Sequence, residues 1–543
     1  AVSDGTSGVL DVTPFLNNGT DTDGADGFQG DFSALTVTTE QSQTSGGRIS
    51  EAVDLATASG TVDVLAGTYD DEVNVTKPLT LNGPNAGTSP NDASTPSNPN
   101  TARVMEAIVK PTSGAAAFHI GADDITIDGF TLDGDFDNDG TGDILFGINN
   151  FDLDAGPFGQ YEATKNFTVT NNIVRDFEGF GIFVCNGDET CTGFGSQATT
   201  GLTTGGVVST NRFVGIDGSG SSAGKAIVMQ VDGIIETVTN NVILTDTPVA
   251  GQTQTGIQTE NLGDVTDASG LTLTFSGNLI DVEDNGFFLN EHSPGAPEVL
   301  VTESVTAGSE VTATRGVSVS AMQAGTKPIT IENSILVSDE ITTDGSGGPI
   351  TGEAVRLDNV SGPVTLDGLT IESQRTGILA SRSAAPIQIT GGTVDSGDNG
   401  IEIGGGSTVE RIERVAFGTV AGDAVVVNAF GGTSSDNGAD LLKAFTGYNG
   451  DFDFSGVVGN VITVEEADDA DGGFARVVGN DLSLAANPAN FDPSDITYNG
   501  TGTPRPKDLS GNWWGTTDIA EVQDKAGSNT DYTPYLDSGD SDT

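Results

Sequence analysis

The chain has 543 residues, 76 of them Gly, and its 78 acidic and 20 basic side chains give a formal net charge of -58. This charge repels nucleic acid, heparin-like polyanions and acidic membrane surfaces, so we expect none of them as a partner. Because 35% of the residues are hydrophobic and 18% are charged, the chain is not a disordered acidic tail. It contains no apolar run long enough to predict a membrane span.

The N-terminal residues 1–44 contain a motif that returns near the other end of the chain. Asp11-Val-Thr-Pro-Phe-Leu16 matches Asp531-Tyr-Thr-Pro-Tyr-Leu536. We interpret residues 1–44 as an extension that resembles the end of a preceding unit. Either the chain is one period of a tandem array, or copies self-associate head to tail through the two motifs, since a solenoid has two open ends. Chance similarity between turn-rich segments is the alternative.

Residues 45–100 are predicted to form an N-terminal cap and the first coils of a solenoid. A short amphipathic helix comes first, and we expect it to cover the open hydrophobic end. Its apolar face consists of Ile49, Ala52, Val53 and Ala56. Strands follow in Gly60–Tyr69 and Val73–Gly83. The stretch EAVDLA…VLAGTYDDEVNVTKPLTLNG resembles the start of pectin-lyase-like proteins, a superfamily that includes pectin methylesterases. This resemblance implies a right-handed β-helix.

An acidic loop stands early in the predicted β-helix body, residues 101–508. The segment Asp133-Gly-Asp-Phe-Asp-Asn-Asp-Gly-Thr-Gly-Asp143 places carboxylates at alternate positions and a Gly at the tight turn, as an EF-hand-like loop does. The bidentate Glu of such loops is missing, because Phe146 stands in its place. We therefore predict a weak, extracellular-type calcium site, with a plain acidic loop as the alternative. The predicted ligands are Asp135, Asp137, Asp139 and Asp143.

Short apolar strands, each preceded by Gly or Ala, recur through the body at spacings of 23 to 30 residues that lengthen where loops are inserted. The small residues are Gly181, Ala226, Gly256, Gly286, Gly316, Ala354, Gly377, Gly400 and Ala424. One and three positions later nearly every residue is apolar, and alternation with period two places both columns on one strand face. Another strand family, such as Phe167–Val174, has Asn or Gly at a corner that needs a positive φ. This pattern predicts an all-β fold, a parallel β-helix of stacked coils.

Two further columns of the repeat concern the surface. Two residues after each small residue the side chain should point outward. The nine residues in this column are Phe183, Val228, Gln258, Phe288, Ser318, Arg356, Leu379, Glu402 and Val426, and five of them are apolar. Inserted loops that fold back would cover them; the alternative is a lateral contact surface. Four residues after each small residue the column is polar: Gln230, Glu260, Asn290, Ser320, Asp358 and Ser381. We favour solvated strand edges here over a shallow sugar-binding groove.

The two cysteines, Cys185 and Cys191, have five residues between them, which suits a small disulfide-closed loop and an oxidising compartment. A zinc site is less suitable, because no His lies nearby.

Residues 509–543 are predicted to form a C-terminal cap and linker. Leu509-Ser-Gly-Asn-Trp-Trp-Gly515, followed by the Asp531–Leu536 motif, resembles the closing motif of secreted bacterial right-handed β-helix repeat proteins. We expect Trp513 and Trp514 to cover the last open coil, although Trp pairs also stack on sugars.

Catalytic groups are hard to find in the sequence. The chain has two histidines: His119, in an apolar strand, is expected to be structural, while His292 beside Glu291 is a weaker candidate for a general base. Motifs of polygalacturonases and pectin methylesterases are absent. The basic candidates Arg315, Arg356, Arg375 and Arg382 have no obvious carboxylate dyad. We therefore expect no enzymatic activity.

These observations predict an extracellular or cell-surface β-helix module that is structural or adhesive and assembles into a fibre or filament. The alternatives are a polysaccharide-acting enzyme (a lyase, esterase or epimerase) and a non-catalytic carbohydrate-binding module. The chain opens without a basic segment followed by an apolar one, so we expect any signal peptide to have been removed.

Overall fold

The computed structural model divides into two compact units, residues 1–283 and residues 284–543, and each is described by itself. No helix in the described ranges is long and apolar enough to cross a membrane. The residues that the structure describes are 12–39, 48–152, 160–161, 164–185, 203–216, 224–244, 254–263, 267–282, 285–302, 310–312, 315–338, 352–383, 386–404, 407, 409–428, 462–466, 496–500, 507–508, 514–526, 530–531 and 533.

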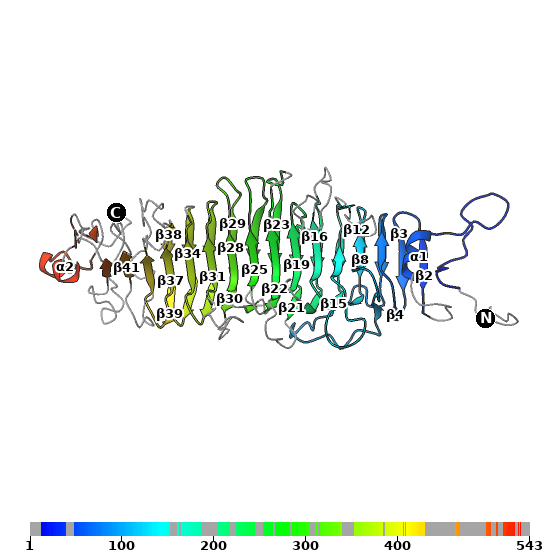
Figure 1. Ribbon diagram of the computed structural model, residues 1–543, viewed down its shortest axis with the longest axis horizontal. Helices are drawn as coiled ribbons and strands as arrows, with labels where there is room; N and C mark the ends of the chain where they lie inside the picture. Colours follow the sequence, from blue (N-terminus) through cyan, green and yellow to red (C-terminus); the bar gives the residue numbers. More distant parts are fainter. Residues whose placement is uncertain are drawn as a thin grey trace. The chain divides into compact units, whose positions relative to one another are not determined.

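The first unit consists of three sheets, which we call A, B and C, and successive strands of the chain enter them in turn (Figure 1). Sheet A contains, in spatial order, β1 (Phe15–Leu16), β2 (Ala34–Val37), β3 (Gly60–Val64), β6 (Leu79–Asn82), β9 (Thr126–Asp128), β14 (Thr168–Thr170), β17 (Val207–Ser209), β20 (Thr237–Thr239) and β23 (Thr272–Ser276). Sheet B contains β4 (Gly67–Tyr69), β7 (Ala107–Val109), β10 (Thr131–Asp133), β15 (Ile173–Phe177), β18 (Arg212–Ile216), β21 (Val242–Leu244) and β24 (Leu279–Asp281). Sheet C contains β5 (Val73–Val75), β8 (Ala116–Ile120), β11 (Phe146–Asn149), β16 (Phe180–Cys185), β19 (Gly224–Gln230) and β22 (Gln254–Glu260).

Neighbouring strands from β2 onward pair in parallel, and each strand pairs with the strand of the next coil. Ile182, Ile227 and Ile257 are Cα partners in β16, β19 and β22, and all three are fully buried. A continuous apolar ladder therefore lines the interior, as alternation along the strands requires. Parallel crossovers of this kind are right-handed. The predicted all-β fold, a right-handed parallel β-helix, is confirmed.

The corners between sheets A and B have the predicted backbone. Asn171 and Asn240 both have a φ of 55°, and Gly277 has a φ of 65°. Asn and Gly accept this left-handed conformation at the lowest cost, so they separate two short strands within one coil.

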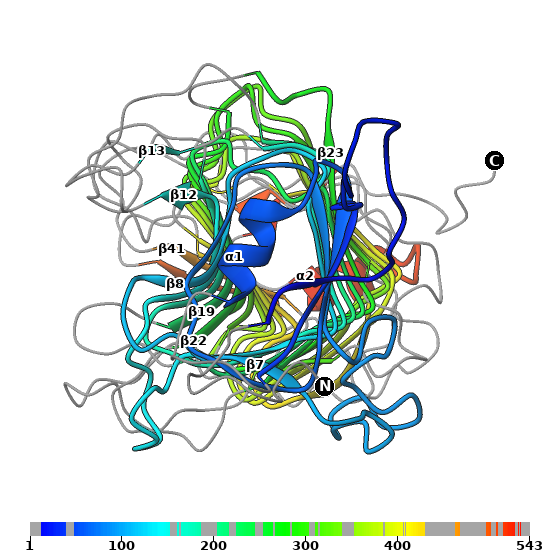
Figure 2. The same cartoon turned by 90° about the vertical axis from the view of Figure 1, so that its right-hand side faces the viewer.

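The helix α1 (Arg48–Leu55) lies across the interior near the first coils, as Figure 2 shows in blue. Its Ile49, Ala52 and Val53 are buried, and the backbone N–H of Ile49 donates to the Asp71 carboxylate at 2.8 Å. The predicted amphipathic helix is thus present, and its apolar face packs on the strands. Outside the three sheets, β12 (Phe151–Asp152) and β13 (Gln160–Tyr161) form an antiparallel pair.

The second unit repeats the arrangement. Sheet A contains β26 (Glu298–Thr302), β29 (Ile329–Glu332), β32 (Val364–Asp367), β35 (Ile387–Thr390) and β38 (Val409–Glu413). Sheet B contains β27 (Glu310–Thr312), β30 (Ile335–Ser338), β33 (Thr370–Ser373), β36 (Thr393–Ser396) and β39 (Ala416–Val420). Sheet C contains β25 (Asn285–Asn290), β28 (Arg315–Ser320), β31 (Val355–Asp358), β34 (Ile378–Ser381), β37 (Ile401–Gly404), β40 (Val425–Asn428), β41 (Ile462–Glu466) and β42 (Ile496–Gly500).

The C-terminal part adds the helix α2 (Ile519–Ala526) and a parallel pair, β43 (Lys507–Asp508) with β44 (Thr530–Asp531). Trp514 is fully buried, as expected for a side chain in a cap. Trp513 lies outside the described residues.

Candidate functional site

The acidic loop connects β10 to β11 and is closed by its own backbone. The carbonyl oxygen of Gly134 accepts hydrogen bonds from the N–H groups of Asp143 and Ile144, at 3.0 and 3.1 Å. Asn138 has a φ of 61°, which turns the chain between them. The two ends of the loop therefore meet at the end of a sheet B strand.

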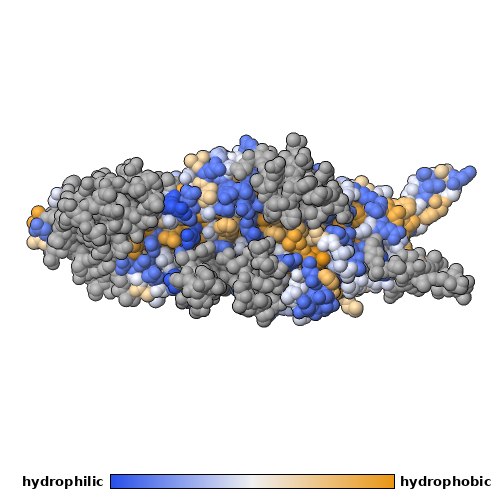
Figure 3. Space-filling model, in the orientation of Figure 1, coloured by the Kyte–Doolittle hydropathy of each residue, from blue (hydrophilic) through white to orange (hydrophobic). Residues whose placement is uncertain are grey.

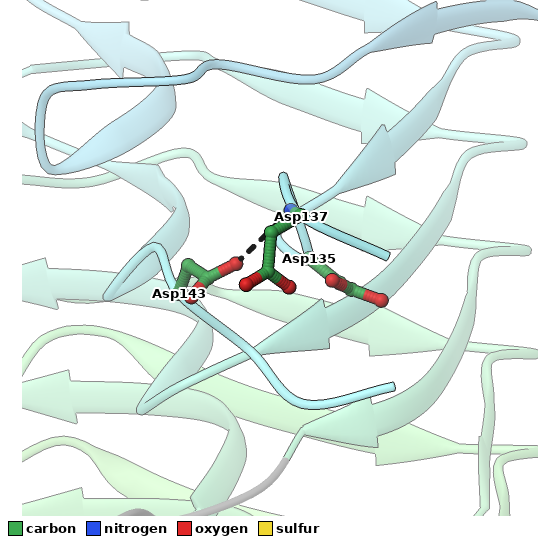
Figure 4. Close-up of side chains that lie close together, drawn as sticks. All are labelled: Asp135, Asp137 and Asp143. Carbon is green, nitrogen blue, oxygen red and sulfur yellow. Dashed lines mark hydrogen bonds between the residues drawn. The ribbon is translucent and has the colours of Figure 1, made fainter. Parts of the chain in front are cut away.

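Three of the four predicted ligands come together in this loop. Ligand oxygens of Asp135, Asp137 and Asp143 lie within 4.8 Å of one another, and Figure 4 shows the Asp137 carboxylate between those of the other two. Asp143 accepts hydrogen bonds from the N–H groups of Phe136 at 3.0 Å and Asp137 at 3.4 Å. Asp135, which is buried, accepts from the N–H groups of Asp139 and Gly140.

The fourth predicted ligand, Asp139, is not part of this cluster. Its carboxylate accepts hydrogen bonds from the hydroxyl and the N–H of Thr141, at 2.6 and 2.9 Å, and these bonds lower its pKa. Asp137 shifts the other way: partial loss of hydration raises its pKa, and the carboxylates of Asp139, Asp143 and Asp135 add to the shift. The sequence pattern indicated carboxylates at alternate positions, but it did not indicate that Asp139 turns to Thr141 and away from the other three.

The carboxylate of Asp133, at the start of the loop, is paired with basic side chains. Arg175 contacts Asp133 at 2.6 Å and Lys110 contacts it at 3.5 Å. Within the described ranges, no ion pair reaches Asp135, Asp137 or Asp143. A cluster of hard oxygen donors without a counter-charge can hold a metal ion.

The outer face of sheet C in the first unit is a second candidate region. Phe183 and Val228 lie there in register, and both are buried. They belong to an apolar cluster with Ala116, Phe146, Phe180, Cys185 and Val231. The Phe180 ring lies 5.2 Å from Phe146 and 5.0 Å from Phe183. The outward apolar positions of this unit are therefore covered, so an open contact surface is not present at them. Elsewhere on the face drawn in Figure 3, apolar residues reach the surface in patches among hydrophilic ones.

His119 lies on this outer face, one position after the inward-facing Phe118 on β8. Its Nδ1 is 3.0 Å from the Oδ1 of Asn149, the residue opposite it on β11, and both side chains are buried. The second histidine, His292, is 2% exposed, and burial lowers its pKa to about 4. It is therefore uncharged at neutral pH, whereas its neighbour Glu291 is exposed. Glu283 and Asp284, two further acidic residues that precede His292 in the sequence, lie outside the described residues.

The predicted polar column forms hydrogen bonds between successive coils. In the first unit, Nε2 of Gln258 and Nε2 of Gln230 both donate to Oε2 of Glu260, at 2.8 and 3.3 Å. In the second unit, the hydroxyl of Ser320 donates to Oδ1 of Asn290 at 2.9 Å. Glu260, Asn290, Ser320, Asp358 and Ser381 are all partly exposed.

Two of the predicted arginines pair with carboxylates that the sequence did not connect to them. Arg382 donates to both oxygens of Asp358, at 3.0 and 2.6 Å. Arg356 lies 3.7 Å from Glu353, which is buried. The Asp358 pair spans two coils, which is why spacing along the chain did not indicate it.

The N-terminal motif lies at the edge of sheet A. Phe15 and Leu16 form β1, which pairs antiparallel with Thr36 and Leu35 of β2. The Thr13 hydroxyl oxygen accepts from the N–H of Thr38 at 3.0 Å. Asp11, and residues 532 and 534–536 of the C-terminal copy, lie outside the described residues.

Cys185 ends β16 and is fully buried, with its N–H and C=O bonded to the Asn150 side chain at 2.9 and 2.7 Å. Its predicted disulfide partner, Cys191, lies outside the described residues, so the pairing stays a prediction.

No protein-family model matches the chain, and no curated protein sequence matches it. Among solved structures, the chain is similar to the A-module of the mannuronan C-5 epimerase AlgE6 of Azotobacter vinelandii, at 13% identity and a TM-score of 0.37, over 87% of this chain and 95% of that one. The AlgE4 A-module of the same organism gives 13% identity and a TM-score of 0.36, over 75% and 89%. A tailspike protein of the Acinetobacter baumannii bacteriophage Fri1, a capsular polysaccharide depolymerase, gives 10% identity and a TM-score of 0.26, over 87% and 62%.

These similarities concern the fold. They nevertheless correct one expectation, that the chain has no enzymatic activity, because the chains that it resembles are epimerases and a depolymerase.

Proposed function

We propose that this chain is an extracellular β-helix protein that acts on a polysaccharide. The observation that carries the proposal is the polar column along sheet C. In the second unit its partly exposed side chains come from successive coils and bond to one another, as Ser320 does with Asn290. In the first unit the buried Gln230 bonds the partly exposed Glu260 of the next coil. Coils repeat such groups about every 4.8 Å, and a linear polysaccharide likewise repeats its hydroxyl groups along its length. The mannuronan epimerase and capsular depolymerase matches favour the same ligand class.

The experiment measures both binding and product formation. Wild-type protein is incubated with mannuronan, polygalacturonate, a bacterial capsular polysaccharide and dextran, with and without Ca²⁺. NMR of the polymer detects epimerisation, and chain length detects cleavage. The double variant Asn290→Ala and Ser320→Ala should weaken binding about tenfold, since two hydrogen bonds of ordinary strength are at stake.

The control is Thr239→Ala with Ser276→Ala, which removes two partly exposed polar side chains from paired strands of sheet A. If no polysaccharide is bound or altered, or if both double variants weaken binding equally, the proposal is rejected.

We further propose that the metal of the acidic loop is calcium, held by Asp135, Asp137 and Asp143. Carboxylate oxygens are the ligands that calcium prefers, and the cluster contains no soft donor. Binding would offset the repulsion among three carboxylates in one loop, so its direct effect would be to stabilise the segment between β10 and β11.

A second candidate function is end-to-end association into a surface fibre. It is favoured by the repeated motif and by the position of its first copy on the outer edge of sheet A. A C-terminal copy from another molecule would compete with β1 for the same edge of β2, which is a strand exchange. The proposal includes the division of the chain predicted from its sequence, into an N-terminal extension, an N-terminal cap, a β-helix body and a C-terminal cap, with boundaries after residues 44, 100 and 508.

Light scattering over a concentration series tests the association. Leu536→Asp should abolish concentration-dependent growth in mass, because it places a charge in the C-terminal copy of the motif, the segment that would replace β1 on β2. Leu65→Asp, at an exposed apolar residue outside the motif, should not. A constant monomer mass for the wild type contradicts the proposal.

A further inference from the structure

The outer face of sheet C in the first unit contains a buried hydrogen-bond acceptor without a donor. Gln230 ends β19 and is 5% exposed, and its Oε1 atom has no partner in the described part of the chain. Buried side-chain oxygens are nearly always paired, so this exception needs a cause.

The orientation of the Gln230 amide is fixed by its neighbour. Its Nε2 donates to Oε2 of Glu260 at 3.3 Å, and Nε2 of Gln258 donates to the same oxygen at 2.8 Å. Rotating the amide by 180° would turn Oε1 toward the carboxylate, which offers only acceptors. The unpaired oxygen therefore cannot satisfy itself by exchanging places with the nitrogen.

The group that would satisfy this oxygen must donate a hydrogen bond. Glu260 adds a second acceptor of hydrogen bonds at the same place, and this residue is partly exposed, so the group of three residues reaches the solvent at Glu260. A carboxylate or phosphate ligand offers no donor and would be repelled by Glu260 and by the net charge of -58. Neutral hydroxyl groups fulfil both requirements.

We propose that Gln230, Gln258 and Glu260 form a subsite for a neutral, hydroxyl-bearing sugar residue, in which a sugar hydroxyl donates to Oε1 of Gln230. Gln258 is a positioning residue, because it holds the Glu260 carboxylate. Sites built to bond a hydroxyl discriminate strongly, since without the ligand their polar groups remain unpaired. The inference rests on the proposed action on polysaccharide and specifies which sugar chemistry this part of sheet C accepts.

The test uses Gln230→Met, which keeps the length of the side chain and removes both the acceptor and the donor. Gln374→Met is the matched control, because Gln374 is exposed and lies in the second unit. Binding of methyl α-mannoside, dextran oligosaccharides and mannuronan oligomers is measured by calorimetry and ligand-observed NMR on the full chain. We expect Gln230→Met to weaken the two neutral ligands about tenfold, while Gln374→Met leaves them unchanged.

A purely structural role for Gln230 predicts a different result. Gln230→Met removes the unpaired acceptor together with one long hydrogen bond to Glu260, at 3.3 Å, so the melting temperature of the ligand-free protein should change little, whereas loss of a structural amide should lower it. Gln230→Leu removes the same atoms with a shorter side chain and guards against misfit of the thioether. Unfolding of both variants, or unchanged affinity for the neutral ligands, overturns the subsite.

The outcomes separate this inference from the function on which it rests. If polymers bind and Gln230→Met has no effect, the subsite is wrong and the action on polysaccharide stands. If no polymer binds but methyl α-mannoside binds and is weakened by Gln230→Met, the subsite stands alone. If no probe binds, both are rejected.

Discussion

Nδ2 of Asn211 donates a hydrogen bond to Oδ1 of Asn241 in the next coil at 3.0 Å, and both side chains are fully buried. The same bond joins Asn172 to Asn211 and Asn241 to Asn278, at 3.2 and 3.0 Å. Each Oδ1 also accepts the backbone N–H of the preceding coil, as Asn211 does from Asn172 at 2.9 Å. This asparagine ladder follows the corner between sheets A and B, where the strand ladder is interrupted and backbone groups need other partners.

Replacing a middle member of the ladder should destabilise the first unit. Asn211→Ala removes the acceptor of the Asn172 N–H and the donor to the carbonyl oxygen of Val169, and all these atoms are buried. We expect the free energy of unfolding to fall by about 2–4 kcal/mol, measured by urea denaturation. Asn98→Ala, at an exposed position, is the control, and an equal loss in both variants would contradict the role of the ladder.

Calcium affinity should distinguish two aspartates in the same loop. Asp137→Asn should weaken Ca²⁺ binding at least tenfold, as roughly expected from one lost charged ligand, while Asp139→Asn should leave it nearly unchanged because Asp139 bonds Thr141 instead. Calorimetric titration of the two variants measures this. Equal losses, or no heat with the wild type, would count against the site.

The same titration should depend on pH. Loss of hydration raises the pKa of Asp137, so this carboxyl binds a proton at a higher pH than an ordinary Asp. Metal binding requires the deprotonated form. Affinity should therefore fall with decreasing pH earlier than it would for unperturbed carboxylates, and titrations at a series of acidic pH values check this.

His292 should make the fold sensitive to acid. Burial lowers its pKa from 6.5 to about 4, so between these values the unfolded chain binds a proton that the folded chain does not. The contribution of His292 to the free energy of unfolding is therefore fully present above pH 6.5 and is lost as the pH falls toward 4. The loss amounts to about 3 kcal/mol. His292→Gln should reduce the difference between urea midpoints at pH 7 and pH 4.5. Glu291→Gln, at the exposed neighbour, should keep it.

Gly129 should not tolerate a side chain. Its φ is +81°, and a Cβ there would overlap the backbone of Asn85 and Ala86. Gly129→Ala should cost about 3 kcal/mol through strain and displacement of that segment. Gly24→Ala is the control, because nothing lies within 4 Å of its Cβ position. Equal urea midpoints for the two variants would refute the expected overlap.

The strand pattern of the repeats was sufficient to predict the β-helix. Ile182, Ile227 and Ile257 occupy equivalent places in successive repeats, and burial of one face is what stacked coils require. The corner at Asn240 was equally predictable, because a residue with positive φ between two short strands is a local requirement. Strand alternation and turn chemistry are properties of a few neighbouring residues, so the sequence alone contains them.

The candidate sites were only partly predictable, since they depend on groups that are brought together from different coils or turned apart within one loop. The spacing of Asp135 to Asp143 indicated an acidic loop, yet only the folded loop directs Asp139 to Thr141 and leaves three carboxylates together. Burial of Phe183 on the outer face, and the bonds that leave Oε1 of Gln230 unpaired, likewise depend on what covers each strand and on its neighbour. Local periodicity therefore determined the coil and its interior. The tertiary structure alone decided which polar groups of separate coils meet, because strand register and inserted segments act between residues some thirty positions apart.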